Sequence, residues 1–114
     1  MNATIWHNPR CSTSRKALAA LEAAGFQPQV VDYLKTGWTE DGLRILFAEA
    51  GLSARQALRA KEPLAAELGL KDATEAQILA AMVAHPILVE RPFVRTTKGT
   101  RLCRPLALLD ELLK

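Results

Sequence analysis

The chain has 114 residues, and 49% of them are hydrophobic, which suits one domain with a buried core. Its formal net charge is +3, from 15 lysines and arginines against 12 aspartates and glutamates, and this balance is too small to indicate a nucleic-acid partner. The sequence shows no apolar run that could span a membrane and no secretory leader, so we expect a single domain over residues 1–114 in the cytoplasm.

The first part of the chain predicts a strand, a helix and a second strand. An apolar run at Ala3–Trp6 predicts the first strand, and Ser12–Ala24 predicts a helix that ends at Gly25. The second strand is expected around Gln29–Tyr33. Strands joined in this way form a parallel pair with a right-handed crossover. A ligand is therefore expected at the carboxyl end of the first strand.

The middle of the chain is predicted to be helical. Thr39 is expected to cap one helix, and Ser53 with Gln56 and Thr74 with Gln77 have the spacing of capping boxes. Inward-facing positions are expected at Leu43, Leu46, Phe47, Ile78, Leu79 and Met82.

The last part predicts a hairpin followed by a helix. Strands are expected at Phe93–Thr96 and Thr100–Cys103, around a turn at Lys98 and Gly99. Pro105 suits the first position of a closing helix, whose apolar face is formed by Leu108, Leu109, Leu112 and Leu113. The whole order predicts an α/β protein with a mixed four-stranded sheet and flanking helices.

The loop between the first strand and the first helix contains Cys11 among cationic and hydroxyl side chains. The unpaired N–H groups of a helix N-terminus favour negative charge, and they lower the pKa of a thiol placed there. Arg15 and Arg10 would add positive charge, so the loop is suited to hold an oxyanion and attack it. The alternative is that Cys11 is a small buried apolar residue. Cys11 and Cys103 make neither a disulfide scaffold nor a metal site, and we expect both to be thiols.

A second cationic group follows between residues 91 and 104, where no acidic residue intervenes. Arginine suits oxyanions because its planar fork donates two parallel hydrogen bonds. The alternative is a solvated strand surface with salt bridges. The five cations are Arg91, Arg95, Lys98, Arg101 and Arg104.

Four stretches of the chain resemble the glutathione- and glutaredoxin-coupled arsenate reductases, and the resemblance runs nearly end to end in the same order. It implies a thioredoxin-like fold with a helical insertion. The four stretches are His7-Asn8-Pro9-Arg10-Cys11-Ser12-Thr13-Ser14-Arg15, Leu58-Arg59-Ala60-Lys61, His85-Pro86-Ile87-Leu88-Val89-Glu90-Arg91-Pro92 and Gly99-Thr100-Arg101-Leu102-Cys103-Arg104-Pro105.

The resemblance also implies a role for each matching residue. Cys11 matches the nucleophile, a cis peptide bond is expected at Arg91-Pro92, and Cys103 is not required by the mechanism. The substrate would be arsenate, with glutathione as co-substrate, glutaredoxin as protein partner, no bound metal or organic cofactor, and a monomeric enzyme. The oxyanion-binding positions match Arg59, Arg91 and Arg104, and the positions that support the thiolate match His7, Ser14 and Arg15.

Other classes of protein share parts of this pattern. The phosphatase-like arsenate reductases are excluded, because they place five residues between cysteine and arginine and only three separate Cys11 from Arg15. Related transcription regulators that bind RNA polymerase usually have C-x-x-C, whereas this chain has C-x-x-S at Cys11–Ser14. The alternatives to an arsenate reductase are a thioredoxin-fold binding protein and a monothiol oxidoreductase. Three oxyanion-binding arginines favour the reductase, because thiol exchange has no evident use for them.

Overall fold

The computed structural model describes residues 2–113, and the chain divides into two compact units. The first unit combines the two ends of the chain, up to Thr36 and from Arg91 onward. The second unit is the segment Gly37–Glu90, which corresponds to the predicted helical insertion. The single domain expected from chain length stays a prediction.

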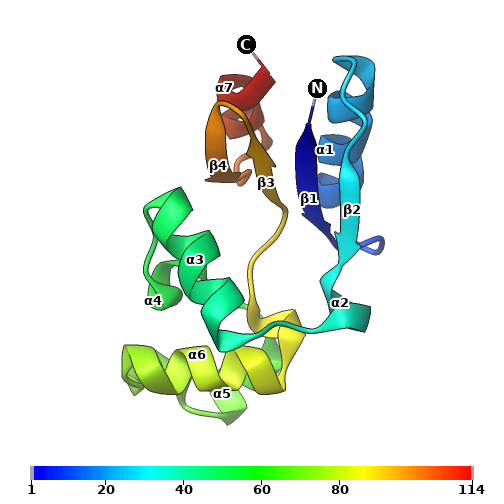
Figure 1. The fold of residues 1–114 in the computed structure, drawn as a ribbon. Coiled ribbons are helices and arrows are strands. Elements are labelled where there is room, and N and C mark those ends of the chain that lie inside the picture. The colour runs from blue at the N-terminus through cyan, green and yellow to red at the C-terminus, as the bar shows by residue number, and fades with distance from the viewer. Residues whose placement is uncertain (1, 114) are drawn as a thin grey trace. The chain divides into compact units, whose positions relative to one another are not determined.

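The first unit contains a mixed sheet whose strands lie in the order β2-β1-β3-β4 (Figure 1). These strands are β1 (Ala3–His7), β2 (Gln29–Asp32), β3 (Phe93–Thr96) and β4 (Gly99–Leu102). β1 pairs parallel with β2 and antiparallel with β3, and β3 pairs antiparallel with β4. The predicted thioredoxin-like α/β fold with a mixed four-stranded sheet is therefore confirmed.

The ends of three strands differ from the prediction by one residue. β1 continues to His7, and β2 stops at Asp32 because the next residues form the short helix α2 (Tyr33–Thr36). β4 begins at Gly99, which pairs with Thr96 across a two-residue turn. That register moves Cys103 out of the strand, although its N–H still donates to the carbonyl of Pro92 at 2.9 Å.

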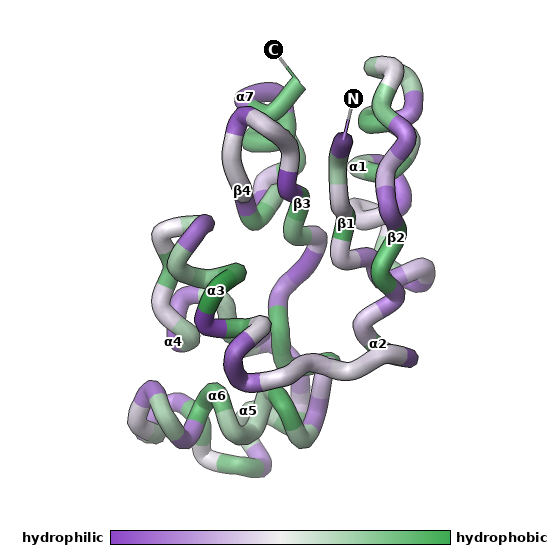
Figure 2. Tube along the Cα trace, viewed as in Figure 1, coloured by the Kyte–Doolittle hydropathy of each residue, from purple (hydrophilic) through white to green (hydrophobic). Residues whose placement is uncertain are grey.

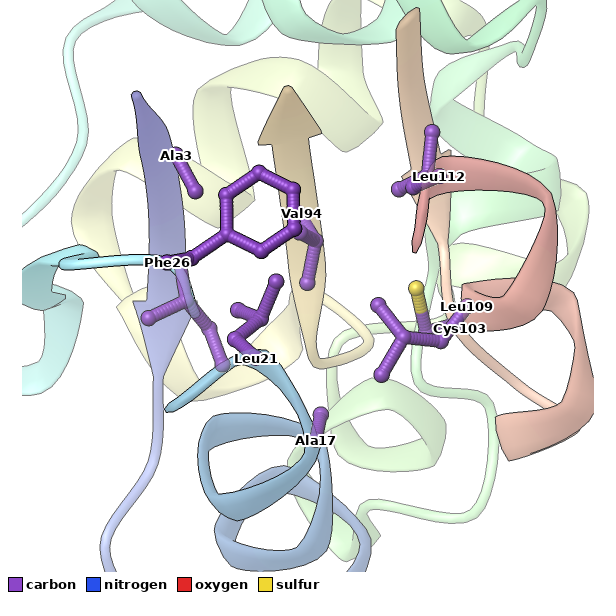
Figure 3. Packing of buried hydrophobic residues seen from close by; sticks show 9 residues of the cluster. Ala3, Ala17, Leu21, Phe26, Val94, Cys103, Leu109 and Leu112 are labelled. Carbon is purple, nitrogen blue, oxygen red and sulfur yellow. The ribbon is translucent and has the colours of Figure 1, made fainter. Parts of the chain in front are cut away.

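Helices cover one face of this sheet and enclose the core of the first unit. Helix α1 (Ser12–Ala23) ends before Gly25, whose φ of 90° is favoured only by glycine. The predicted closing helix divides into the 3-10 turn η3 (Leu106–Leu109) and α7 (Asp110–Leu113), and it follows Pro105 rather than starting there. Figure 3 shows their side chains meeting those of β1 and β3; the buried cluster is Ala3, Ile5, Ala17, Leu21, Phe26, Val94, Cys103, Leu109 and Leu112.

The second unit is helical, as predicted. Thr39 caps α3 (Glu40–Ala50), and both predicted capping boxes form, at α4 (Ala54–Ala57) and α6 (Glu75–Ala84). Hydrophilic and hydrophobic residues alternate along α3 (Figure 2), and its buried residues are the predicted Leu43, Leu46 and Phe47. The remaining elements are α5 (Pro63–Glu67), η1 (Leu70–Asp72) and η2 (Pro86–Leu88).

The helices of residues 2–113 are all too short or too polar to cross a bilayer.

Candidate active site around Cys11

Cys11 is the N-cap residue of α1, and it lies just beyond the carboxyl end of β1. Its backbone is fixed on both sides, because its N–H donates to the carbonyl of Asn8 and its carbonyl accepts from the N–H of Arg15, both at 3.0 Å. The residue is 8% exposed. The sequence therefore folds locally into a strand, a tight turn and a helix, and this places the sulfur at a helix N-terminus.

The pKa of the Cys11 thiol is lowered from its ordinary value. Burial acts in the opposite direction and would raise this pKa, because it disfavours the charged thiolate. The backbone N–H of Ser14, the hydrogen bond and positive charge of Arg91, and the backbone N–H of Thr13 outweigh burial and stabilise the thiolate. The predicted helix-terminus effect is present, and the strongest side-chain contribution comes from Arg91 rather than from Arg15.

Two arginines of the predicted oxyanion site lie beside Cys11. Arg91 is a charged residue with only 6% of its surface exposed. Arg104 places Nη1 3.9 Å from the sulfur of Cys11, and the same nitrogen donates to the carbonyl of Arg91 at 3.3 Å. The structure thus brings together three residues from positions 11, 91 and 104 of the chain.

Each of these two arginines precedes a proline in a cis peptide bond. The bond Arg91-Pro92 is cis, as the resemblance predicted. The bond Arg104-Pro105 is also cis, which sequence reasoning missed.

His7 and Ser14 form a buried pair behind the cysteine loop. The Nδ1 atom of His7 lies 2.6 Å from Oγ of Ser14, and the N–H of Asn8 donates to the same Oγ at 3.1 Å. The pKa of His7 is lowered by burial and by the charge of Arg15, while the carboxylate of Asp32 raises it to a smaller extent than burial lowers it. His7 and Ser14 therefore lie together behind the cysteine loop, and their support of the Cys11 thiolate stays a prediction.

Asn8 is a structural residue of this site that sequence reasoning missed. It is 4% exposed, and its Oδ1 accepts the N–H of Arg10 at 2.9 Å. Asparagine next to proline between a strand and a helix is a known turn signal, because its side chain can satisfy a nearby backbone N–H. That signal is present at Asn8-Pro9 in the sequence.

Arg15 contacts the backbone of the cysteine loop. Its Nη1 donates to the carbonyl of Pro9 at 2.8 Å, so the side chain lies across the outside of the loop. Its charge acts on the pKa of His7. Arg15 therefore shapes the loop, and any direct support of the Cys11 thiolate by Arg15 stays a prediction.

Arg59 belongs to the second unit, where two carboxylates flank its guanidinium. Its Nη1 lies 3.5 Å from Glu62, and its Nε lies 4.0 Å from Glu90. The backbone N–H of Arg59 donates to the carbonyl of Leu88 at 2.8 Å, which anchors this turn. The role of Arg59 in oxyanion binding stays a prediction.

Other members of the second cationic group have their own contacts away from Cys11. The guanidinium of Arg95 stacks over the ring of Trp6 at 4.8 Å, and Arg101 forms an ion pair with Glu111 at 3.0 Å. Arg101 therefore matches the alternative of a strand surface with salt bridges. Only Arg91 and Arg104 of the five are placed at the cysteine by the contacts above.

Cys103 differs sharply from Cys11. It is fully buried in the core of the first unit, and burial raises the pKa of its thiol to about 12. A thiol with such a pKa is protonated at neutral pH and is a poor nucleophile. Within residues 2–113, no three His, Cys, Asp or Glu side chains gather in a group that could hold a metal ion.

The chain is similar to known arsenate reductases along nearly its whole length. It is 55% identical to the arsenate reductase ArsI2 of Synechocystis sp. over 111 residues, covering 96% of this chain and 79% of the relative. It is 48% identical to the arsenate reductase of Rhizobium meliloti, covering 99% of this chain and 82% of the relative.

A solved structure gives the same result. The arsenate reductase from Vibrio cholerae superposes with a TM-score of 0.93 at 41% identity, and the match covers 98% of both chains. The model of the ArsC family matches residues 6–112. The family match and the identities over almost the whole sequence agree with the cysteine loop described above, and the chain belongs to the ArsC family.

Proposed function

We propose that this protein reduces arsenate to arsenite, with Cys11 as the nucleophile. The observation that supports this most strongly is the position of the Cys11 sulfur, at a helix N-terminus and beside Arg91 and Arg104. A thiolate and two guanidinium groups at one place can attract a tetrahedral oxyanion and attack its central atom. A protein that only exchanges thiols would need the cysteine but not the arginines.

Arsenate would bind with its oxygens towards the guanidinium groups. Arg91 is buried and Arg104 is more exposed, so one would fix the anion from inside the site and the other from its solvent side. Charge-assisted hydrogen bonds of this kind are strong, and they become stronger as negative charge develops on the oxygens during attack. Arg59 would add a third donor, in exchange for part of its contact with Glu62 and Glu90.

The first chemical step would be displacement of an arsenate oxygen by sulfur. The Cys11 thiolate forms the S–As bond and one As–O bond breaks, while H₂AsO₄⁻ takes up one proton and releases the oxygen as water. The product is Cys11–S–AsO₃H⁻, in which arsenic is still As(V). This is covalent catalysis by an activated nucleophile, and the lowered pKa of Cys11 supplies the thiolate.

Reduction would follow when the thiol of glutathione attacks the sulfur of the adduct. The S–As bond breaks and its electron pair remains on arsenic, so As(V) becomes As(III) and leaves as H₂AsO₃⁻. Cys11 and glutathione are oxidised together to a mixed disulfide. Glutaredoxin then restores the Cys11 thiol by thiol–disulfide exchange. We further propose that the protein works as a monomer in the cytoplasm, where glutathione is available.

The test is a coupled assay with the purified protein, arsenate, glutathione, glutaredoxin, glutathione reductase and NADPH. The proposal predicts NADPH oxidation that depends on arsenate and stops when Cys11→Ser replaces the wild-type protein. Cys103→Ser is the matched control, because it also removes one thiol, and it should retain most of the activity. NADPH oxidation without arsenate, on a glutathionylated disulfide substrate, would support a monothiol oxidoreductase instead. No NADPH oxidation with any substrate would support a binding protein.

A further inference from the structure

We infer that Asp32 is a positioning residue of the active site, whose carboxylate lies beside His7 and directs the hydrogen bond between His7 and Ser14. Asp32 is the last residue of β2 and was not among the residues expected to act at the site. The inference rests on the proposed function, since it assigns the control of a residue at that same site.

The sheet register places Asp32 directly beside His7. The two residues are Cα partners at the carboxyl ends of the parallel strands β1 and β2. Paired residues on neighbouring parallel strands project from the same face of a sheet, and the strands lie about 4.8 Å apart. His7 is 7% exposed, and the Oδ1 atom of Asp32 is buried without a hydrogen-bond partner among the described residues. A buried carboxylate oxygen of this kind is costly unless a nearby positive charge compensates it.

The hydrogen bonds of Ser14 make the protonation of His7 important. Oγ of Ser14 accepts from the N–H of Asn8 and lies 2.6 Å from Nδ1 of His7. A serine hydroxyl has one hydrogen to donate and two lone pairs to accept with. When Nδ1 is unprotonated, the Ser14 hydroxyl must donate to it. When Nδ1 is protonated, it donates to Ser14, and the hydroxyl hydrogen is free to turn to another acceptor.

Two charged side chains, Asp32 and Arg15, act on the protonation of His7, and they act in opposite directions. Asp32 on β2 favours the imidazolium, and Arg15 on α1 opposes it, while burial also opposes it. Cys11 and Arg91 lie on the cysteine-loop side, where Arg91 acts on the thiolate of Cys11. Of the two side chains whose charge acts on His7, Asp32 is the negative one. A protonated His7 adds positive charge near Cys11, which further favours the thiolate.

The test combines a titration of His7 with turnover. The chain has two histidines, His7 and His85, so each imidazole can be followed by NMR as a function of pH, and exposed His85 serves as an internal reference. The isosteric variant Asp32→Asn should make His7 titrate at lower pH and leave His85 unchanged. The opposite variant, Arg15→Gln, should make His7 titrate at higher pH. The exposed Asp110→Asn on α7 is the matched control.

The same variants separate positioning from a purely structural role. In Asp32→Asn, kcat/KM for arsenate at neutral pH should fall on the order of three- to tenfold, because a neighbouring opposite charge shifts a protonation equilibrium by that factor or more. KM should change little, and Asp32→Glu should recover most of the rate by restoring the charge.

The inference is overturned if His7 titrates in Asp32→Asn as it does in Asp110→Asn. It is equally overturned if His7 shifts but kcat/KM and its pH profile do not. The titration needs no turnover, so a wild-type protein without arsenate activity would contradict the proposed function while the titration still decides the role of Asp32. If Asp32→Asn does not fold, Arg15→Gln and Asp32→Glu test the same inference: the first removes the positive charge that acts on His7, and the second keeps the negative charge.

Discussion

Replacing Arg91 by alanine should damage both the nucleophile and the oxyanion site. Arg91 lowers the pKa of Cys11 through a hydrogen bond and through its charge, so its loss raises that pKa and leaves less thiolate at neutral pH. The same change removes one charge-assisted donor to the transition state, which costs about 3 kcal/mol, or about a hundredfold in kcat/KM. We therefore expect Arg91→Ala to lose about a hundredfold in arsenate turnover and to alkylate more slowly at Cys11.

Two further variants make this experiment specific. Arg91→Lys keeps the charge but loses the planar fork, so we expect it to retain more thiolate than Arg91→Ala while recovering little of the turnover. Arg101→Ala is the matched control, because Arg101 lies on β4 and its guanidinium forms an exposed ion pair with Glu111 and a hydrogen bond to the carbonyl of Thr100. Its effect on stability should stay within about 0.5 kcal/mol.

The assay is steady-state kinetics on arsenate, combined with iodoacetamide alkylation of Cys11 and with circular dichroism to check folding. The reasoning is refuted if folded Arg91→Ala matches Arg101→Ala in both turnover and alkylation rate. A loss of turnover with an unchanged alkylation rate would refute the part of the argument that concerns the thiolate.

Three further predictions concern the thiols and the core. Because the pKa of Cys11 is lowered and that of Cys103 is about 12, iodoacetamide at neutral pH should modify Cys11 alone. As pH rises, the alkylation rate of Cys11 should reach its plateau at a lower pH than the rate of an ordinary thiol does. Modification of Cys103 in the folded protein, detected by mass spectrometry, would contradict this prediction. The pKa of Cys103 is higher in the folded protein than in the unfolded chain, where a thiol ionises from about pH 8.5. Rising pH therefore favours the unfolded chain above that pH, and the stability that Cys103 contributes at neutral pH is lost. The difference in the free energy of unfolding between the wild type and Cys103→Ala, measured in urea, should become smaller above that pH. Leu21→Ala should lower the free energy of unfolding by about 2–5 kcal/mol, because Leu21 is fully buried in the core of the first unit. The control is Leu34→Ala, which removes an exposed leucine and should lower it by about 1 kcal/mol or less. Equal losses in the two variants would contradict the description of the core.

Local chemistry made much of the fold predictable. Capping boxes at Ser53 and Thr74 marked the starts of α4 and α6, and both boxes form. Gly25 marked the end of α1. These signals are short-range, because each depends on residues within four positions of one another. The ends of these helices can therefore be predicted without knowledge of the tertiary structure.

Register and turn geometry were less predictable. The hairpin strand β4 starts one residue earlier than expected, because the turn closes at Gly99 and not at Thr100. The cis bond before Pro105 has no signal in the local sequence that distinguishes it from a trans bond. Features of this kind depend on the pairing of distant segments, and a single sequence does not specify that pairing.

The same distinction between local and long-range features decides which residues of the site could be predicted. Cys11 could be placed at the helix N-terminus from the sequence, because strand, loop and helix are contiguous. The assignment of Arg91 as the main cation beside it could not come from spacing, since Arg15 is nearer in sequence. Asp32 was missed for the same reason, because only the parallel register of β1 and β2 brings it beside His7.

The most direct measurement of the central claim is a single turnover with protein, arsenate and glutathione, in the absence of glutaredoxin. Arsenite would be counted against protein, and peptides would be analysed by mass spectrometry under non-reducing conditions. The account predicts a first burst of about one arsenite per protein, as expected for a covalent intermediate, with glutathione attached to the peptide that contains Cys11. Formation of arsenite at the wild-type rate by Cys11→Ser, or attachment of glutathione at Cys103 alone, would contradict it.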